Sequence, residues 1–398
     1  MQNRSSHDAW IYLDNNASTR LDSRVLEAML PFLSGRPGNP SSSHSPGQNA
    51  REAVRIARTQ VSCLLGAACD EEIVFTSGGT ESNNTALLSA IETQTDRNEI
   101  VVSTIEHASI LAICSRLEKA GRARVIRVGV DSEGRLNQAE FAAALSHRTA
   151  IASVQWANNE TGVIQPVGAL ARLAHQAGAL LHCDAVQGAG KYAINVSATE
   201  IDMLSISAHK LHGPQGVGAL YLRKGTPFHA LLCGGRQQRA RRAGTENVAG
   251  IAGFGAAAKL AEESLKNSVA PIAALRDRLE SEIAAAIPAV HILGSRAERL
   301  PNTSLIAFAD MEGDDLVTLL DREGIAVSSG SACATGTMEP SHVVKAMRVP
   351  FAYLRGAVRF SLSRETTAAE IACVTEILPA LLGELVQPTQ WGVAGYVD

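Results

Sequence analysis

Seven short apolar runs recur between residues 73 and 222, and helical patterns at 80–91, 108–120 and 167–177 lie between several of them. Such alternation predicts an α/β fold whose largely parallel sheet is covered by helices on both faces. Ligands of these sheets bind beyond the carboxyl ends of the strands, so the residues just after each strand are candidates for a site. The predicted strands are 73–75, 100–103, 125–130, 151–156, 180–183, 203–206 and 217–222.

At 398 residues the chain is too long for one compact core, so two domains are expected. The alternating pattern ends near an alanine-rich helical stretch at 250–263, and a separate amphipathic helix is predicted at 272–287. Strands and helices then mix up to the end of the chain. We therefore predict a large domain over 21–264 and a smaller α+β domain over 265–398, with residues 1–20 packing near the small domain.

Composition narrows the class of protein. The net charge of −4 and the lack of a dense basic stripe give no reason to expect a nucleic-acid partner. The seven cysteines are scattered without a CxxC pair, which argues against a disulfide framework or a metal site and predicts a cytoplasmic protein. No signal peptide and no apolar run of membrane-spanning length is evident, so no membrane association is expected.

A lysine follows the predicted strand at 203–206. That strand delivers Ser207, His209 and Lys210 into a turn rich in glycine and proline. A lysine at a strand end is most often a solvated surface charge. The glycines that follow Lys210 indicate a close approach of backbone or ligand, and a lysine with a lowered pKa could form a Schiff base with a carbonyl cofactor.

Two further strand ends carry groups that suit the same cofactor. Gly79 and Thr80 start a helix directly after the strand at 73–75, and the free N–H groups of such a helix start suit a phosphate. Asp184 ends the strand at 180–183 and could keep a pyridine nitrogen protonated. Each has an ordinary alternative as a helix cap. A phosphate cradle, an acid and a lysine together predict a pyridoxal phosphate enzyme.

Three polar residues behind other strands could contact the ring of this cofactor. Asn159 and Gln187 could reach the ring oxygen, and His107 could stack on the ring face. A lone histidine is more often structural, so the interpretation of His107 depends on its neighbours.

A second group of candidates lies in the small domain. Cys333 sits in the run 326–340, whose glycine, serine and alanine residues pack no core, and this favours a reactive thiolate on an exposed, mobile loop. A cysteine is otherwise most often a small buried hydrophobe. Arg359, on the predicted strand 358–361, could bind a substrate carboxylate through two hydrogen bonds or form an ordinary surface ion pair.

With these residues in place, the chain resembles the cysteine desulfurases of the class V aminotransferase family. The resemblance runs almost end to end, and its short active-site loop is closest to the nitrogen-fixation (NifS-like) branch. The motifs that carry it are Tyr12-Leu-Asp-Asn-Asn-Ala, Gly38-Asn-Pro-Ser-Ser, Thr76-Ser-Gly-Gly-Thr-Glu-Ser, Trp156-Ala-Asn-Asn-Glu-Thr-Gly, His209-Lys-Leu-His-Gly-Pro, Arg242-Ala-Gly-Thr-Glu-Asn, Ser328-Ser-Gly-Ser-Ala-Cys and Arg359-Phe-Ser-Leu-Ser-Arg.

The resemblance implies a type I pyridoxal phosphate fold, a homodimer with sites at the subunit interface, and a cytoplasmic enzyme. It implies that L-cysteine becomes L-alanine while Cys333 takes the sulfur as a persulfide. The persulfide would then pass to an iron–sulfur scaffold protein, and the branch implies that the clusters serve nitrogenase. By matching motifs, the cofactor contacts are Gly79, Thr80, His107, Asn159, Asp184, Gln187, Ser207, His209, Lys210 and the partner subunit's Thr245, while Asn39 and Arg359 hold the substrate carboxylate.

Three departures from the family pattern stand out. The family usually has Gly-Gly-His-Gln-Glu-Arg-Gly, where this chain has Gly234-Gly-Arg-Gln-Gln-Arg-Ala, so Arg236, Gln238 and Ala240 differ. Arg355 stands where the family has histidine, and alanine follows Cys333 where the family has threonine. None of these changes removes a residue with a chemical role, and they bear on acceptor docking and loop behaviour.

Two rival functions remain open at this stage. A selenocysteine lyase or a cysteine sulfinate desulfinase shares the fold and the lysine, and release of alanine from cysteine and from selenocysteine would discriminate. A non-catalytic scaffold for assembly partners is the other alternative, and a purified protein without the absorbance of bound cofactor would favour it.

Overall fold

The computed structural model describes residues 10–329 and 339–386. Its largest element is a seven-stranded sheet in the order β2-β8-β7-β6-β5-β3-β4. Only β8 in this sheet runs antiparallel to its neighbours, so the predicted α/β class with a mainly parallel sheet is confirmed. Its strands are β2 (Ile73–Thr76), β3 (Glu99–Ser103), β4 (Arg124–Val128), β5 (Thr149–Gln155), β6 (Leu180–Asp184), β7 (Met203–Ser207) and β8 (Gly218–Leu222).

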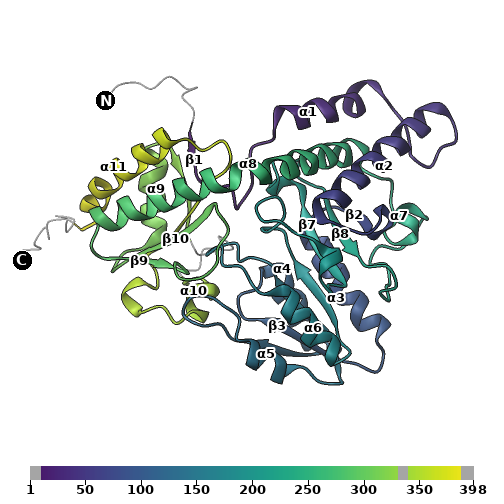
Figure 1. Ribbon diagram of the computed structural model, residues 1–398, viewed down its shortest axis with the longest axis horizontal. Coiled ribbons are helices and arrows are strands. Elements are labelled where there is room, and N and C mark those ends of the chain that lie inside the picture. Colours follow the sequence, from purple (N-terminus) through teal and green to yellow (C-terminus); the bar gives the residue numbers. More distant parts are fainter. Residues whose placement is uncertain (1–9, 330–338, 387–398) are drawn as a thin grey trace, which may run out of the picture.

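Helices cover this sheet, and their buried faces explain why they form (Figure 1). In α2, for example, Val54, Ala57, Val61 and Leu64 recur at helical spacing and are buried in the main core. All seven predicted strands are present, with bounds that differ by one or two residues. The helices of this part are α1 (Ser23–Leu30), α2 (Ser45–Leu65), α3 (Gly79–Thr93), α4 (Ala108–Lys119), α5 (Gln138–Ala144), α6 (Val167–Gln176) and the short α7 (Gln237–Ala240).

A second core surrounds an antiparallel sheet in the order β12-β13-β10-β9. The strand β1 (Ile11–Tyr12) joins this part by pairing in parallel with β11 (Ile325–Ala326). The residues 10–20 therefore contact the C-terminal part of the chain, although the division into domains stays a prediction. The other elements are β9 (Val290–Leu293), β10 (Thr303–Phe308), β12 (Ser328–Ser329), β13 (Ala357–Ser361), α9 (Gly313–Arg322), α10 (His342–Ala346) and α11 (Ala368–Val386).

One helix, α8 (Val248–Ala286), joins the two cores (Figure 1). Ile251 and Phe254 belong to the core around the large sheet, whereas Leu279 and Ile283 belong to the core of the C-terminal part. The prediction of two separate helices at 250–263 and 272–287 was wrong, because Pro271 lies inside one continuous helix. The predicted boundary at residue 264 also falls within α8. No helix in the described ranges is long and apolar enough to cross a membrane.

Candidate active site

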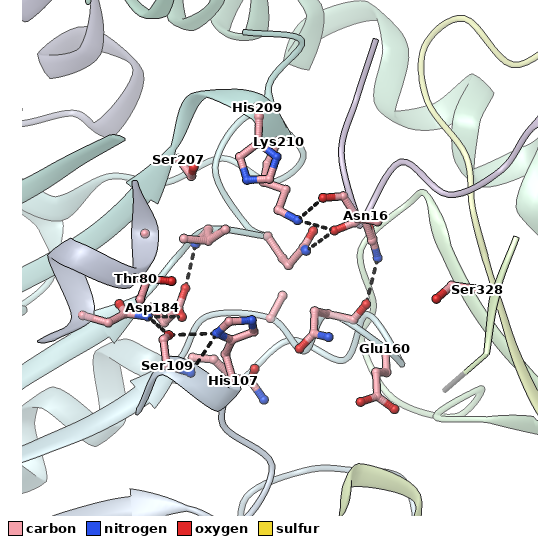
Figure 2. A pocket seen from close by; sticks show the side chains of 18 of the residues that line it. Asn16, Thr80, His107, Ser109, Glu160, Asp184, Ser207, His209, Lys210 and Ser328 are labelled. Carbon is pink, nitrogen blue, oxygen red and sulfur yellow. Dashed lines mark hydrogen bonds between the residues drawn. The ribbon is translucent and has the colours of Figure 1, made fainter. Parts of the chain in front are cut away.

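A cavity of about 350 Å³ opens at the carboxyl ends of the parallel strands, which is a size typical of small-molecule sites. Figure 2 shows polar side chains from the large sheet on one side and the β12 strand on the other. The structure brings together ten of the residues predicted for the site: Gly79, Thr80, His107, Asn159, Asp184, Gln187, Ser207, His209, Lys210 and Arg359.

Lys210 enters the cavity from a 3-10 turn that follows β7. Its Nζ atom donates hydrogen bonds of 2.6 Å to the backbone oxygens of Asn16 and Ala17 (Figure 2). Burial and the nearby charge of Arg359 lower the pKa of Lys210 from 10.5 to about 8. About a tenth of this amine is therefore unprotonated at pH 7, and the unprotonated form is the one that attacks a carbonyl group.

Asp184 ends β6 and is buried, with 6% of its surface exposed. Its Oδ2 atom accepts a 2.7 Å hydrogen bond from Asn83 Nδ2, and its Oδ1 atom accepts one of 3.0 Å from the Val186 backbone N–H. These two donors fix the carboxylate at the inner wall of the cavity (Figure 2). An acid held in this way suits a protonated ring nitrogen.

The start of α3 forms a second wall of the cavity. Gly79 is the first residue of this helix, and a Cβ atom there would lie 2.7 Å from Val186 Cγ2. The first N–H groups of a helix have no partner within it, and the helix dipole adds partial positive charge. With the hydroxyl groups of Thr80 and Ser207 lining the same cavity, this wall suits an anionic group such as a phosphate.

His107 caps α4 and lines the cavity below Asp184 (Figure 2). Its Nδ1 atom accepts a 3.1 Å hydrogen bond from the Ser109 backbone N–H and lies 2.8 Å from Ser109 Oγ. Both contacts are on one side of the imidazole and hold the ring in place. His209, on the opposite wall, has its pKa lowered to about 4 by burial and by the charges of Lys210 and Lys191, so it is neutral at pH 7.

Arg359 comes from β13 in the C-terminal part and reaches the cavity across the gap between the two sheets. Its Nη2 atom forms a 2.7 Å ion pair with Asp14, and its Nη1 atom donates to the Asn159 backbone oxygen at 3.1 Å. Its Nε atom is buried and has no hydrogen-bond partner among the described residues. A donor left in this state suits an incoming carboxylate.

Three predicted residues are not part of this cavity. Asn39 is exposed in the loop before α2, where its side chain accepts a hydrogen bond from the Ser41 N–H. Thr245 is also exposed and away from the cavity of its own chain. Cys333 lies outside the described residues.

The sequence interpretation missed several polar residues of the site, among them Asn16, Asn83, Ser109 and Glu160. Asn16 and Glu160 belong to two of the quoted motifs, and Asn83 directly follows a third, so each had a local signal. The contact of Glu160 had none, because its partner Ser341 Oγ lies 2.6 Å away but 181 positions further along the chain. Burial raises the pKa of Glu160 to about 7.

The departures from the family pattern at 236–240 have a structural counterpart. Gln238, which replaces a glutamate, is buried, and its Oε1 atom accepts hydrogen bonds of 3.0 Å from the Phe75 N–H and from Arg58. Its Nε2 atom donates to Glu246 at 3.3 Å, a contact that a glutamate would turn into repulsion. Ala240, which replaces a glycine, has a φ of 61°, in the left-handed region that favours glycine.

The donor set of the cavity fits pyridoxal phosphate. An amine, a buried carboxylate and an anion-binding helix start lie around one space, and these are the groups that the aldehyde, the ring nitrogen and the phosphate of this cofactor require. The close packing of Gly79 on Val186 shows that the helix start can approach the cavity only without a side chain.

Comparison with known proteins agrees with this architecture. Residues 11–374 match the family described as aminotransferase class-V. The chain therefore belongs to the class V aminotransferase family and, within it, to the cysteine desulfurases that its sequence resembles.

The individual relatives match over nearly their whole length. A cysteine desulfurase of Cereibacter sphaeroides is 56% identical over 375 residues, which cover 94% of this chain and 96% of the relative. The cysteine desulfurase NifS of Azotobacter vinelandii is 48% identical over 390 residues, covering 98% and 96%. A solved structure of a NifS-like protein superposes with a TM-score of 0.88 at 36% identity and covers 94% of this chain and all of that one. The resemblance to the NifS-like branch is confirmed.

Proposed function

We propose that this protein converts L-cysteine and the Cys333 thiol into L-alanine and a Cys333 persulfide, with pyridoxal phosphate bound in the cavity at the strand ends. The observation that carries this proposal is the arrangement of Lys210, Asp184 and Arg359 around one cavity. An amine donor, a ring acid and a carboxylate-binding group are the three features that an amino-acid substrate and this cofactor require. The membership in the cysteine desulfurases supports cysteine as that amino acid.

When bound, pyridoxal phosphate supplies an electron sink for bonds at the amino-acid carbon atoms. Asp184 would face the ring nitrogen, and Asn83 and Val186 hold both of its carboxylate oxygens in place for that contact. The start of α3, with Thr80, Ser207 and His209, would hold the phosphate, and His107 would stack on the ring. Asn159 and Gln187 would bind the ring oxygen.

Lys210 has two tasks in this scheme. Its amine attaches the cofactor, and the lowered pKa of about 8 makes the neutral form available for that attachment. Once the substrate has taken its place, the same Nζ atom is free to remove or return a proton at the substrate α-carbon. A lysine with an ordinary pKa of about 10.4 would be protonated almost completely at pH 7 and would do neither well.

Arg359 and Cys333 act on the substrate itself. The unpartnered Nε atom of Arg359, with a neighbouring Nη atom, binds the substrate carboxylate. Asn39 lies away from the cavity of its own chain, so a contact with this carboxylate requires the loop before α2 to move or a second subunit to supply it. The Cys333 thiolate attacks the substrate sulfur, the carbon–sulfur bond breaks, and the sulfur stays on Cys333 as a persulfide.

The wider setting of the reaction follows from the family. We place the enzyme in the cytoplasm as a homodimer in which Thr245 of each subunit reaches the phosphate of the other site. The persulfide passes to an iron–sulfur scaffold protein, and the likeness to the NifS-like branch supports nitrogenase as the destination of the clusters. The exposed side of Thr245, which no cavity of its own chain accounts for, supports the shared site.

Purified protein loaded with pyridoxal phosphate tests this function. With L-cysteine and a reducing thiol, we expect equal amounts of alanine and sulfide, and with L-cysteine alone a persulfide on Cys333 found by mass spectrometry. Cys333→Ser should keep the cofactor absorbance and release almost no alanine, because a hydroxyl is a far weaker nucleophile at neutral pH. If Cys333→Ser releases alanine as fast as the parent, the sulfur acceptor is another group.

A further inference from the structure

A second lysine, Lys191, lies beside the cavity and has no part in the proposed chemistry. The chain turns after β6, and the backbone hydrogen bond from the Tyr192 N–H to the Gly188 oxygen, 2.9 Å long, fixes the position of Lys191. It lines a smaller cavity of about 50 Å³ that Lys210 and Asn302 also line. Burial and the like charges of Lys210 and Arg359 lower its pKa well below the ordinary value.

The amine of Lys191 joins two residues that face the main cavity. Its Nζ atom donates a 2.8 Å hydrogen bond to Gln187 Oε1 and one of 3.2 Å to Asn16 Oδ1. Gln187 and Asn16 are buried, with 6% and 1% of their surfaces exposed. An amine that is surrounded by like charges and yet holds two neutral amide oxygens has a positioning task rather than an ion-pairing one.

The hydrogen bonds determine which way the Gln187 amide points. Its Nε2 atom donates at 2.9 Å to the Asn16 backbone oxygen, which is only an acceptor. Its Oε1 atom must therefore face Lys191. With one N–H committed to Asn16 and the oxygen held by Lys191, the only donor that the amide has left is its second N–H.

We propose that Lys191 is a positioning residue that fixes the Gln187 amide so that its free N–H is presented to the ring oxygen of the bound cofactor. The inference rests on the proposed cofactor site. Without the Lys191 amine, Gln187 Oε1 loses its 2.8 Å donor, and the amide is held only by its bond to the Asn16 backbone oxygen. The amide can then turn about that one bond, and its free N–H moves away from the ring oxygen.

The experiment uses the loaded protein and the pH at which its yellow absorbance titrates. A hydrogen-bond donor to the ring oxygen stabilises the negative charge that remains on that oxygen after the titrating proton has left. Losing this donor therefore makes the proton harder to remove. Lys191→Met should therefore move the midpoint upward by about 0.5 to 1 pH unit, the size of one hydrogen bond. Lys191→Arg keeps a donor at this position and should stay near the parent value. Tyr192→Phe, whose hydroxyl contacts only Glu298 in the described residues, is the matched control and should not move the midpoint.

A double-mutant cycle separates positioning from a direct effect of charge. In the Gln187→Leu background, Lys191→Met should cause no further shift, because no amide is left to position. A full additional shift in that background would overturn the proposal and assign the effect to the Lys191 charge. An unchanged midpoint in Lys191→Met alone would overturn it as well.

Two controls complete the design. Failure of the parent itself to bind the cofactor would refute the proposed function rather than this inference. Should Lys191→Met fail to fold in a thermal unfolding scan, Lys191→Leu takes its place in the cycle, because leucine also has no donor for Gln187 Oε1.

Discussion

Two regions of the molecule differ in whether one chain alone satisfies their polar groups and backbone. They are the strand-end cavity and residues 236–245, here called the arginine segment. In the cavity, Asp184 has two donors, Lys210 has two acceptors, and Gln187 and Asn16 bind one another. The two carboxylate oxygens of Asp184 and the amide oxygen of Gln187 thus already have partners within the chain. The cavity is therefore built by the fold of one subunit.

The arginine segment is arranged in the opposite way. Gln238, Arg239 and Ala240 have backbone φ values of 46°, 60° and 61°, which residues other than glycine rarely adopt. Leu231 and Leu232, just before it, are 39% and 41% exposed. Backbone strain beside exposed apolar residues is the pattern expected of a segment that functions against another molecule. This difference supports the proposed homodimer, in which one chain completes the strand-end cavity and a second copy contacts the arginine segment.

The largest effect is expected when the amine of Lys210 is removed from the cavity. Lys210→Ala should lower alanine production by about a thousandfold or more, since both attachment of the cofactor and proton transfer depend on Nζ. Reduction of the parent with borohydride, followed by peptide mass spectrometry, should find the cofactor on Lys210 and, in the variant, on no lysine. Cofactor trapped on another lysine of the variant would contradict the assignment.

The next effect concerns pH. Because the folded pKa of Lys210 is about 8, the neutral amine is the minor form below pH 8 and the major form above it. Attachment of pyridoxal phosphate to the cofactor-free protein should therefore quicken about tenfold per pH unit below pH 8 and level off above it. Stopped-flow absorbance measures the rate, with Nα-acetyl-lysine as a control whose rate keeps rising to about pH 10. A protein profile that also rises to pH 10 would show that the cavity does not lower the pKa.

A mixing experiment tests the arginine segment directly. Lys210→Ala and Thr245→Ala subunits, unfolded and refolded together, should form mixed dimers in which one site is intact and the other carries both lesions. If Thr245→Ala is itself nearly inactive, random pairing restores about a quarter of the parent activity. Mixing Lys210→Ala with the double variant is the control and should restore none. Activity no higher than the mean of the two homodimers would show that each site uses its own Thr245.

The smallest effect concerns the backbone of the same segment. Ala240→Gly relieves a left-handed conformation, although glycine also gains freedom in the unfolded chain. The net result should be a rise of about 0.5 to 1 kcal/mol in the free energy of unfolding, measured with urea. Ala274→Gly, at an exposed position in the interior of α8, is the control and should lower it by about 1 kcal/mol. Equal destabilisation by both changes would show that position 240 carries no strain.

The sequence predicted the large sheet and the strand-end residues well because both have local signals. An apolar run followed by glycine or a polar residue marks a strand and the point where it ends, so Asp184 and Lys210 could be found without the structure. The helix α8 was misread because a proline usually ends a helix, whereas Pro271 lies between two stretches that separate cores hold in helical form.

Other contacts had no local signal at all. Glu160 and Ser341 meet only because the two parts of the chain pack together, and the same holds for Arg359 and Asp14. Lys191 and Gln187 are four residues apart, but the meaning of that spacing depends on Asn16, which lies 171 positions earlier than Gln187. Long-range polar contacts of this kind are invisible to periodicity and to motifs.

The continuity of α8 has a mechanical consequence for catalysis. Lys210 follows β7 of the large sheet, and Arg359 lies on β13 of the small one. The two cores are joined by α8, a helix of 39 residues, rather than by a loop. A helix resists bending except where its backbone hydrogen bonding is interrupted, and Pro271 causes one such interruption in α8. Bending of α8 at Pro271 would therefore change the distance from the Lys210 amine to the Arg359 guanidinium, and the contacts of Arg359 with Asp14 and Asn159 oppose such a change.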